Sequence, residues 1–186
     1  MSRKRTILTE TDVEDFVRPE YAGKDFMHDL THIHRVYALA LELGASHPHD
    51  AEILLAGAYF HGIVYTREAA IRDFLMAHGI APERIEGMLR AARESQKDEA
   101  ADTIDGRLLH DAHLLEGGRT FLITKSLVVG TLRGQTLDQT IRYIEERVLG
   151  QFQCYLPETQ ARYADHEQFA ADYLADLKRH LRYERL

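Results

Sequence analysis

The chain has 186 residues and 45% of them are hydrophobic, so it can bury a core of the size usual for one domain. Its formal net charge is -7, with 30 Asp and Glu against 23 Lys and Arg, which argues against the basic stripe of a general nucleic-acid binder. The single cysteine, Cys154, excludes an intrachain disulfide, and no apolar stretch approaches the roughly 18 residues of a membrane span, so we expect a cytoplasmic protein without membrane partners.

Apolar residues recur at three- and four-residue spacing along nearly the whole chain, which is typical of successive amphipathic helices. Only four prolines interrupt the pattern, and strand-like alternation is not sustained anywhere, so we expect an all-α fold. The run Thr11-Asp12-Val13-Glu14 is a capping-box pattern for a first helix, and Asp50, Thr66 and Pro82 are helix-start signals. After the first, the predicted helices cover residues 28–45, 50–61, 66–79, 82–95, 103–116, 119–131, 137–149 and 166–183.

The connecting stretches are short, and no repeat or linker divides the chain, which favours one all-α domain over residues 1–186. The stretch 136–186 is rich in aromatic residues, which can close the bundle, cover a site or form the face of a homodimer. Intramolecular packing is the simplest interpretation, because aromatic side chains at helical spacing usually lie in a core.

Two of the predicted helices place histidines on faces that should be buried. His32 lies four residues before Val36, on the inward stripe of helix 28–45, and His28 lies one turn earlier. His61 ends the apolar stripe of helix 50–61, where Gly57 is small enough to let another helix approach closely. A single inward histidine is usually a satisfied core residue, so neither position indicates a site by itself.

A carboxylate lies on the apolar stripe of helix 103–116. Asp111 falls between Leu108 and Leu115, whereas His110 and His113 are expected to point away from it, at the surface or behind a site. An inward carboxylate is costly unless it is paired or binds a metal. Imidazole and carboxylate together are the usual ligands of zinc, iron and manganese, and facing helices commonly assemble them. A buried His-Asp hydrogen-bond network without metal is the alternative.

Three segments carry a resemblance to a known family. They read DFMHDLTHIHRV at 25–36, LLAGAYFHGI at 54–63 and LLHDAHLL at 108–115. Together they resemble the HD-domain superfamily of metal-dependent phosphohydrolases over residues 25–118, in which a histidine before an Arg-Val pair, a His-Asp doublet and a later aspartate bind the metal. The resemblance implies an HD-like multi-helix bundle with residues 119–186 as further helices packing on this core.

By the same resemblance, His32, His61 and Asp111 are the expected ligands of a divalent ion, which can be Zn, Mn, Fe or Mg. The implied reaction is hydrolysis of a phosphate ester or anhydride of a small molecule, for example a nucleotide. In this chemistry the metal lowers the pKa of its water and polarises phosphoryl oxygens.

Gly62 departs from the family pattern, because the doublet here is His61-Gly62 instead of His-Asp. The glycine removes one carboxylate ligand and its negative charge. Three expected ligands remain, which is enough for a zinc site with an open position. Two functions therefore stay open: a phosphohydrolase, or a degenerate HD domain that binds metal or a phosphorylated ligand without turnover. A di-iron oxygenase, a minority chemistry of the superfamily, needs more histidine ligands than the pattern supplies.

Two further residues are candidates for a catalytic role. Glu94 lies near the end of helix 82–95 and can replace the missing carboxylate, although a solvent-facing glutamate in the charged run 93–99 is the simpler interpretation. His28 can support His32 from behind or contact a phosphate, although a core or capping role needs less special geometry.

Phosphate recognition requires cations near the site. Arg35, Lys97 and Arg119 are the candidates by position, and Arg119 also stands at a predicted helix start, where backbone N–H groups favour anions. For each of the three, a surface role or a structural ion pair is the simpler interpretation.

Overall fold

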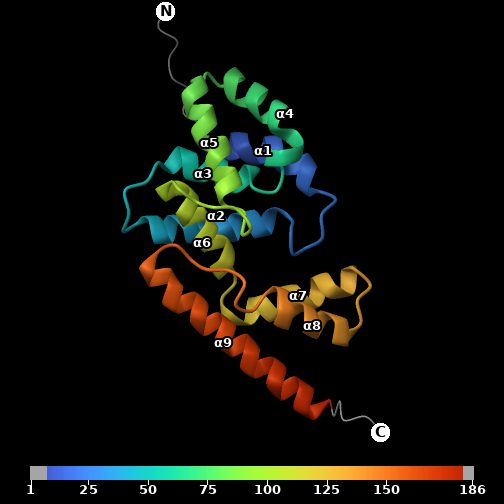
Figure 1. Ribbon diagram of the computed structural model, residues 1–186. Helices are drawn as coiled ribbons and strands as arrows, with labels where there is room; N and C mark the ends of the chain where they lie inside the picture. The colour runs from blue at the N-terminus through green and yellow to red at the C-terminus, as the bar shows by residue number, and fades with distance from the viewer. Residues whose placement is uncertain (1–7, 182–186) are drawn as a thin grey trace, which may run out of the picture. The chain divides into compact units, whose positions relative to one another are not determined.

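The computed structural model describes residues 8–181, and all nine regular elements within them are α-helices (Figure 1). The first six are α1 (Glu10–Tyr21), α2 (Leu30–Gly44), α3 (Ala51–Phe60), α4 (Val64–Ala77), α5 (Pro82–Glu94) and α6 (Ile104–Leu115). The last three are α7 (Arg119–Leu132), α8 (Leu137–Arg147) and α9 (Pro157–His180). The all-α class is therefore confirmed. None of these helices is long and apolar enough to cross a membrane.

The chain divides into two compact units, with the boundary between Leu114 and Leu115. The first unit contains nearly all of the HD-like segment, and the second contains the C-terminal helices. The predicted packing of residues 119–186 on the core stays a prediction.

Helix α3 is the centre of the first unit and packs against α1, α2 and α5, while α4 packs against α5. Every residue of α3 from Leu54 to Phe60 is buried, which explains why this helix is apolar on all sides. A Cβ on Gly57 would lie 2.5 Å from the side chain of Leu109 and 3.2 Å from that of Ala91. The expected close approach of other helices at Gly57 is confirmed, and it brings α5 and α6 against the end of α3.

Of the four sequence signals named for helix starts, two are confirmed and two are wrong. Asp50 caps α3 by accepting from the backbone N–H groups of its first turn, and Pro82 opens α5. The first capping box instead joins Thr9 to Asp12, which exchange the same reciprocal bonds two residues earlier in the chain. Thr66 lies inside α4, which begins after Ile63 without a side-chain cap.

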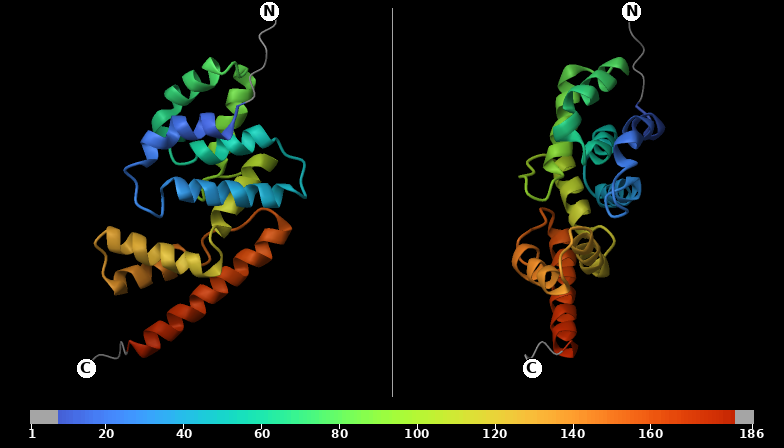
Figure 2. Two further views of the ribbon diagram at one scale, coloured as in Figure 1. Left: turned by 180° about the vertical axis from the view of Figure 1, so that it is seen from behind. Right: turned by 90° about the vertical axis from the view of Figure 1, so that its right-hand side faces the viewer.

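In the second unit, α7 packs against both α8 and α9. Helices α7 and α8, gold and orange in Figure 2, run side by side. Their core contains the buried residues Ile141, Ile144 and Leu174. Helix α9 begins at Pro157 instead of residue 166, because Pro157 suits the first turn of a helix. The predicted end of this helix at 183 lies outside the described residues.

Candidate metal centre

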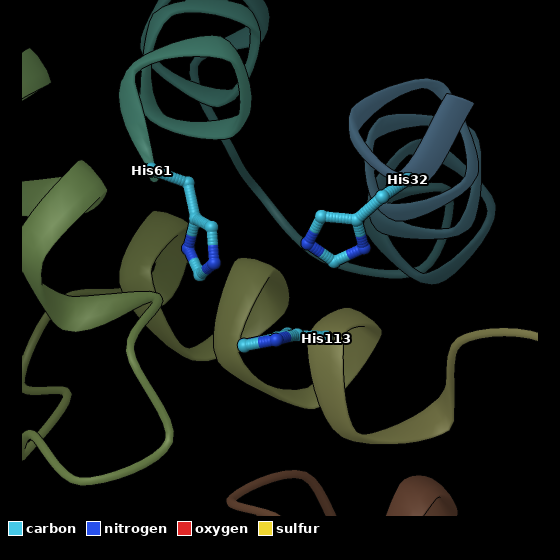
Figure 3. Close-up of side chains that lie close together, drawn as sticks. All are labelled: His32, His61 and His113. Atoms are coloured by element: carbon cyan, nitrogen blue, oxygen red, sulfur yellow. The ribbon is translucent and has the colours of Figure 1, made fainter. Parts of the chain in front are cut away.

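Three histidines from three helices of the first unit converge in one place (Figure 3). His32 comes from α2, His61 is the C-cap of α3, and His113 comes from α6. One nitrogen from each ring lies within 4.8 Å of the others. Within residues 8–181, this is the one group of three or more His, Cys, Asp or Glu side chains close enough to share a metal ion.

The surroundings of the group are largely closed to solvent. His32 is 3% exposed, His61 is 7% exposed, and His113 is partly buried. The ring centroids of His61 and His113 are 4.5 Å apart, and that of His32 lies 5.7 Å and 5.4 Å from them. These separations leave the rings facing one another across a small space, as Figure 3 shows.

Local capping positions the first of the three rings. Asp29 caps α2 by accepting from the backbone N–H of Thr31 at 2.8 Å, so the helix starts just before His32. The neighbouring Ile33 and Val36 are fully buried and fix the rotation of the helix about its axis. The side chain of His32 is thereby directed toward the ends of α3 and α6.

Ser95 contacts both of the other two rings. Its hydroxyl donates to the carbonyl of Ala92 at 2.7 Å and can therefore accept from Nδ1 of His61, 2.6 Å away. The carbonyl oxygen of Ser95 lies 3.2 Å from Nδ1 of His113, and a carbonyl can only accept. The carbonyl contact places the proton of His113 on Nδ1 and its lone pair on Nε2, while Nδ1 of His61 also lies 3.2 Å from the side-chain amide nitrogen of Gln96. Hydrogen bonds of this kind are what orient histidine ligands in metal sites.

The group fits a divalent metal ion by its chemistry. Three neutral imidazoles are a known ligand set of catalytic zinc, with the fourth position open to water or substrate. The ring of His113 is already held in the tautomer that leaves Nε2 able to coordinate. The close approach of three basic nitrogens in a mostly buried place is otherwise costly, and a shared cation would offset this cost.

Asp111, the predicted third ligand, is buried as expected but is not a member of the three-histidine group. Its Oδ1 lies 3.2 Å from Nδ1 of His110, which is buried beside it. His113, which we expected to point elsewhere, lies with His32 and His61 instead. The reason is that α6 is buried around most of its circumference, from residue 108 to residue 112. A single inward stripe is therefore not defined, and helical phase could not separate the two positions.

Glu94 is buried, contrary to the solvent-facing interpretation, and its carboxylate is held by other side chains. It accepts from Nε of Arg90 at 2.6 Å, from the backbone N–H of Thr103 at 3.1 Å and from the Thr103 hydroxyl. Burial alone would raise the pKa of Glu94, but the bonds from Thr103 and Arg90 outweigh it and hold that pKa below its ordinary value. These contacts account for its burial without a catalytic role, which stays a prediction.

Two other predicted site residues are His28, which lies just before α2, and Arg35, which lies within it. The ring of His28 lies 6.2 Å from that of His32, and its Nδ1 lies 2.9 Å from Asp25. Arg35 donates to the hydroxyl of Thr31 at 2.9 Å. Their proposed contacts with substrate remain predictions.

Two other cations were predicted to bind phosphate. Lys97 lies partly buried in the loop between α5 and α6. Arg119 belongs to the second unit, where its guanidinium lies 4.8 Å from the centre of the Phe169 ring. The substrate contacts expected of both residues also remain predictions.

Lys24 and Tyr21, which sequence reasoning missed, fill the space beside Gly62. A Cβ on Gly62 would lie 2.7 Å from the Tyr21 hydroxyl oxygen and 2.8 Å from the Lys24 ammonium nitrogen. Lys24 donates to the carbonyl of Gly62 at 3.1 Å, and the N–H of Gly62 donates to the Tyr21 hydroxyl at 3.1 Å. A phenol and an ammonium group from another part of the chain thus occupy the place where a side chain at residue 62 would begin.

The fold and the histidine group define an all-α protein with the fold of the HD-superfamily hydrolases, as the resemblance implied. An HD-superfamily hydrolase from Bacillus thuringiensis is similar with a TM-score of 0.71 and 16% identity, over 94% of this chain and 95% of that one. YpgQ of Bacillus subtilis, solved in complex with ADP, is similar with a TM-score of 0.74 and 18% identity, over 94% and 99%. The Lin1889 protein from Listeria innocua is similar with a TM-score of 0.72 and 16% identity, over 96% and 100%.

At these identities the likeness establishes the fold. No protein-family model and no curated protein matches the sequence.

Proposed function

We propose that this protein is a divalent-metal-dependent phosphohydrolase acting on a small phosphorylated molecule, with His32, His61 and His113 as the metal ligands. The observation that carries the proposal is the convergence of three imidazole nitrogens within 4.8 Å on an HD fold. Asp111 remains the alternative third ligand from the same helix. A nucleotide is the favoured substrate class, because the structurally similar YpgQ was solved with ADP.

The ligand set favours some metals over others. Imidazole suits zinc and iron, whereas magnesium prefers carboxylate and water oxygens. We therefore place zinc, iron and manganese ahead of magnesium as the resident ion. Three neutral ligands also leave the full double positive charge of the ion uncompensated, which favours an anionic substrate such as a phosphate.

The reaction is the transfer of a phosphoryl group to water. A water oxygen forms a bond to phosphorus, the bond from phosphorus to the leaving oxygen breaks, and the leaving oxygen takes up a proton. A divalent ion bound at the site would supply Lewis acidity to the phosphoryl oxygens and lower the pKa of water. The part of Ser95 is to hold His61 and His113 with Nε2 directed into the site.

A ligand-binding protein without turnover is the second candidate, and the Gly62 position favours it. The ammonium of Lys24 lies where the doublet carboxylate would add a ligand and a negative charge. Loss of that charge weakens the attraction for a cation, while retention of the histidines preserves a place for a phosphorylated ligand.

The test is elemental analysis of protein purified without chelator, followed by hydrolysis assays on nucleoside mono-, di- and triphosphates and sugar phosphates with added zinc, manganese, iron or magnesium. We expect about one bound transition-metal ion and hydrolysis that is lost in His61→Ala. Protein that carries no metal and hydrolyses none of the panel would contradict the proposal. A nucleotide that raises the melting temperature but is never cleaved would establish the second candidate.

A further inference from the structure

We propose that Lys24 is the anion-binding residue of this centre, and that its ammonium group contacts the phosphate of the bound ligand. The inference rests on the proposed function and names the side chain that recognises the phosphate. The ammonium group stands where a side chain at residue 62 would begin, so the place next to His61 carries a positive charge.

The location of Lys24 is the first reason. Its Nζ donates to the carbonyl of Gly62, the residue that directly follows His61. The same nitrogen lies 2.8 Å from the position of a Cβ on Gly62, so it stands at the root of the missing side chain. The ammonium group is thus bonded to the residue next to a histidine of the centre.

Tyr21 holds this ammonium in place. The nitrogen lies 4.1 Å from the centre of the Tyr21 ring, within the range of a cation–π contact. The ring is 2% exposed, and its hydroxyl bonds both the N–H of Gly62 and the carbonyl of Tyr59 at 3.2 Å. A buried and doubly bonded ring gives Lys24 a fixed resting position, which reduces the entropy lost when a ligand binds.

Within residues 8–181, no carboxylate forms an ion pair with Lys24. The acidic residues that act on it electrostatically are Glu20 and Asp25. Glu20 pairs with Arg67 at 2.6 Å, and Asp25 pairs with His28 at 2.9 Å. An ammonium group has three donors, and one is directed at the Gly62 carbonyl, so others can serve a phosphate oxygen. Burial lowers the pKa of Lys24, which shows that its charge is partly desolvated and would be stabilised by an anion.

The positive charge of Lys24 should affect the affinities for phosphate and for a metal ion in opposite directions. A positive group beside the centre attracts a phosphate and repels a divalent cation. Removal of the charge should therefore weaken phosphate binding while leaving metal affinity unchanged or higher. A residue that only supports the fold would affect both affinities in the same direction.

The experiment compares the wild-type chain with Lys24→Gln, which keeps a donor for the Gly62 carbonyl, and with Lys24→Arg, which keeps the charge. Inorganic phosphate and ADP are titrated calorimetrically into the zinc-loaded protein, and zinc affinity is measured by chelator competition. We expect Lys24→Gln to weaken phosphate binding about tenfold and Lys24→Arg to retain most of it, since a hydrogen bond to a charged group is of this strength. Lys178→Gln, at an exposed lysine in α9, is the charge-matched control and should change neither affinity.

Two results would overturn the inference alone. One is a wild-type protein that binds zinc and phosphate while Lys24→Gln binds phosphate equally well. The other is a parallel loss of zinc and phosphate affinity in Lys24→Gln, which would make Lys24 structural. A wild-type chain that binds neither zinc nor phosphate would instead overturn the proposed function, and this inference with it.

Discussion

The hydroxyl of Ser95 lies 2.6 Å from Nδ1 of His61, and both residues are buried. That hydroxyl donates to the Ala92 carbonyl and can accept from Nδ1 of His61, which also lies 3.2 Å from the side-chain amide nitrogen of Gln96. This small side chain thus helps to fix the orientation of the His61 ring.

Ser95→Ala removes this acceptor and should weaken zinc binding by about ten- to a hundredfold, the range for residues that orient a histidine ligand. The tautomer of His61 in the metal-free protein, measured by nitrogen NMR of the imidazoles, should become a mixture. Ser126→Ala is the control, because Ser126 makes a similar bond to the Leu122 carbonyl without a histidine partner. Unchanged zinc affinity in Ser95→Ala would show that the bond does not orient the ligand.

Two variants can show whether His113 or Asp111 is the third metal ligand beside His32 and His61. His113→Ala should abolish stoichiometric zinc binding, because two histidines alone hold the ion weakly. Asp111→Asn has nearly the same shape and should retain the metal with at most a few-fold loss. Elemental analysis and chelator competition measure both. The reverse pattern, with metal lost in Asp111→Asn and kept in His113→Ala, would restore the ligand set implied by the family resemblance.

Gly62→Asp should not create a better metal site. Its Cβ would meet Tyr21, which is buried and bonded on both sides, and Lys24, whose ammonium would pair with the new carboxylate. We expect about 1 kcal/mol of lost stability from the overpacking and no gain in zinc affinity. Denaturant unfolding and chelator competition are the measurements.

Gly23→Asp is a matched control for that substitution, because a Cβ on Gly23 meets nothing within 4 Å. It should leave stability nearly unchanged. A gain of both metal and hydrolysis in Gly62→Asp would mean that the chain has lost an HD site, and that Lys24 moves aside readily.

Glu94 should contribute to stability in a pH-dependent way. Its pKa in the folded chain lies below the ordinary value of 4.5, so the folded state takes up its proton less readily than the unfolded state. The stabilisation is therefore complete above about pH 4.5 and is lost as the pH falls through the lower, folded value. Glu94→Gln should cost about 1 kcal/mol at pH 7 and less at acid pH.

Urea unfolding of Glu94→Gln at several pH values tests this pH dependence of stability. Glu146→Gln, at an exposed position, is the control. A pH-independent loss in Glu94→Gln would show that the carboxylate charge does not matter. Loss of hydrolysis in a variant that remains stably folded would instead support the catalytic role first considered for Glu94.

Much of the fold could be predicted because helical signals are local. The three- and four-residue spacing of apolar side chains, the cap at Asp50 and the proline at Pro82 each act within a turn or two of the chain. Local signals also explain two helix starts that were predicted in the wrong place. Thr9 is as good an N-cap residue as Thr11, and Pro157 suits the first turn of α9. Helical phase was informative for His32 and His61, which lie on helix faces that are buried.

The amino-acid sequence alone was sufficient for the all-α class and the inward placement of His32 and His61, since these depend on periodicity within one helix. The HD-like order of segments came from a resemblance carried by three short motifs. Only the tertiary structure brought His113 into the centre, because α6 is buried on most sides and its phase selects no single face. It also placed Lys24 beside Gly62, 38 residues along the chain. Contacts between such distant segments depend on how whole helices pack, and no local pattern records them.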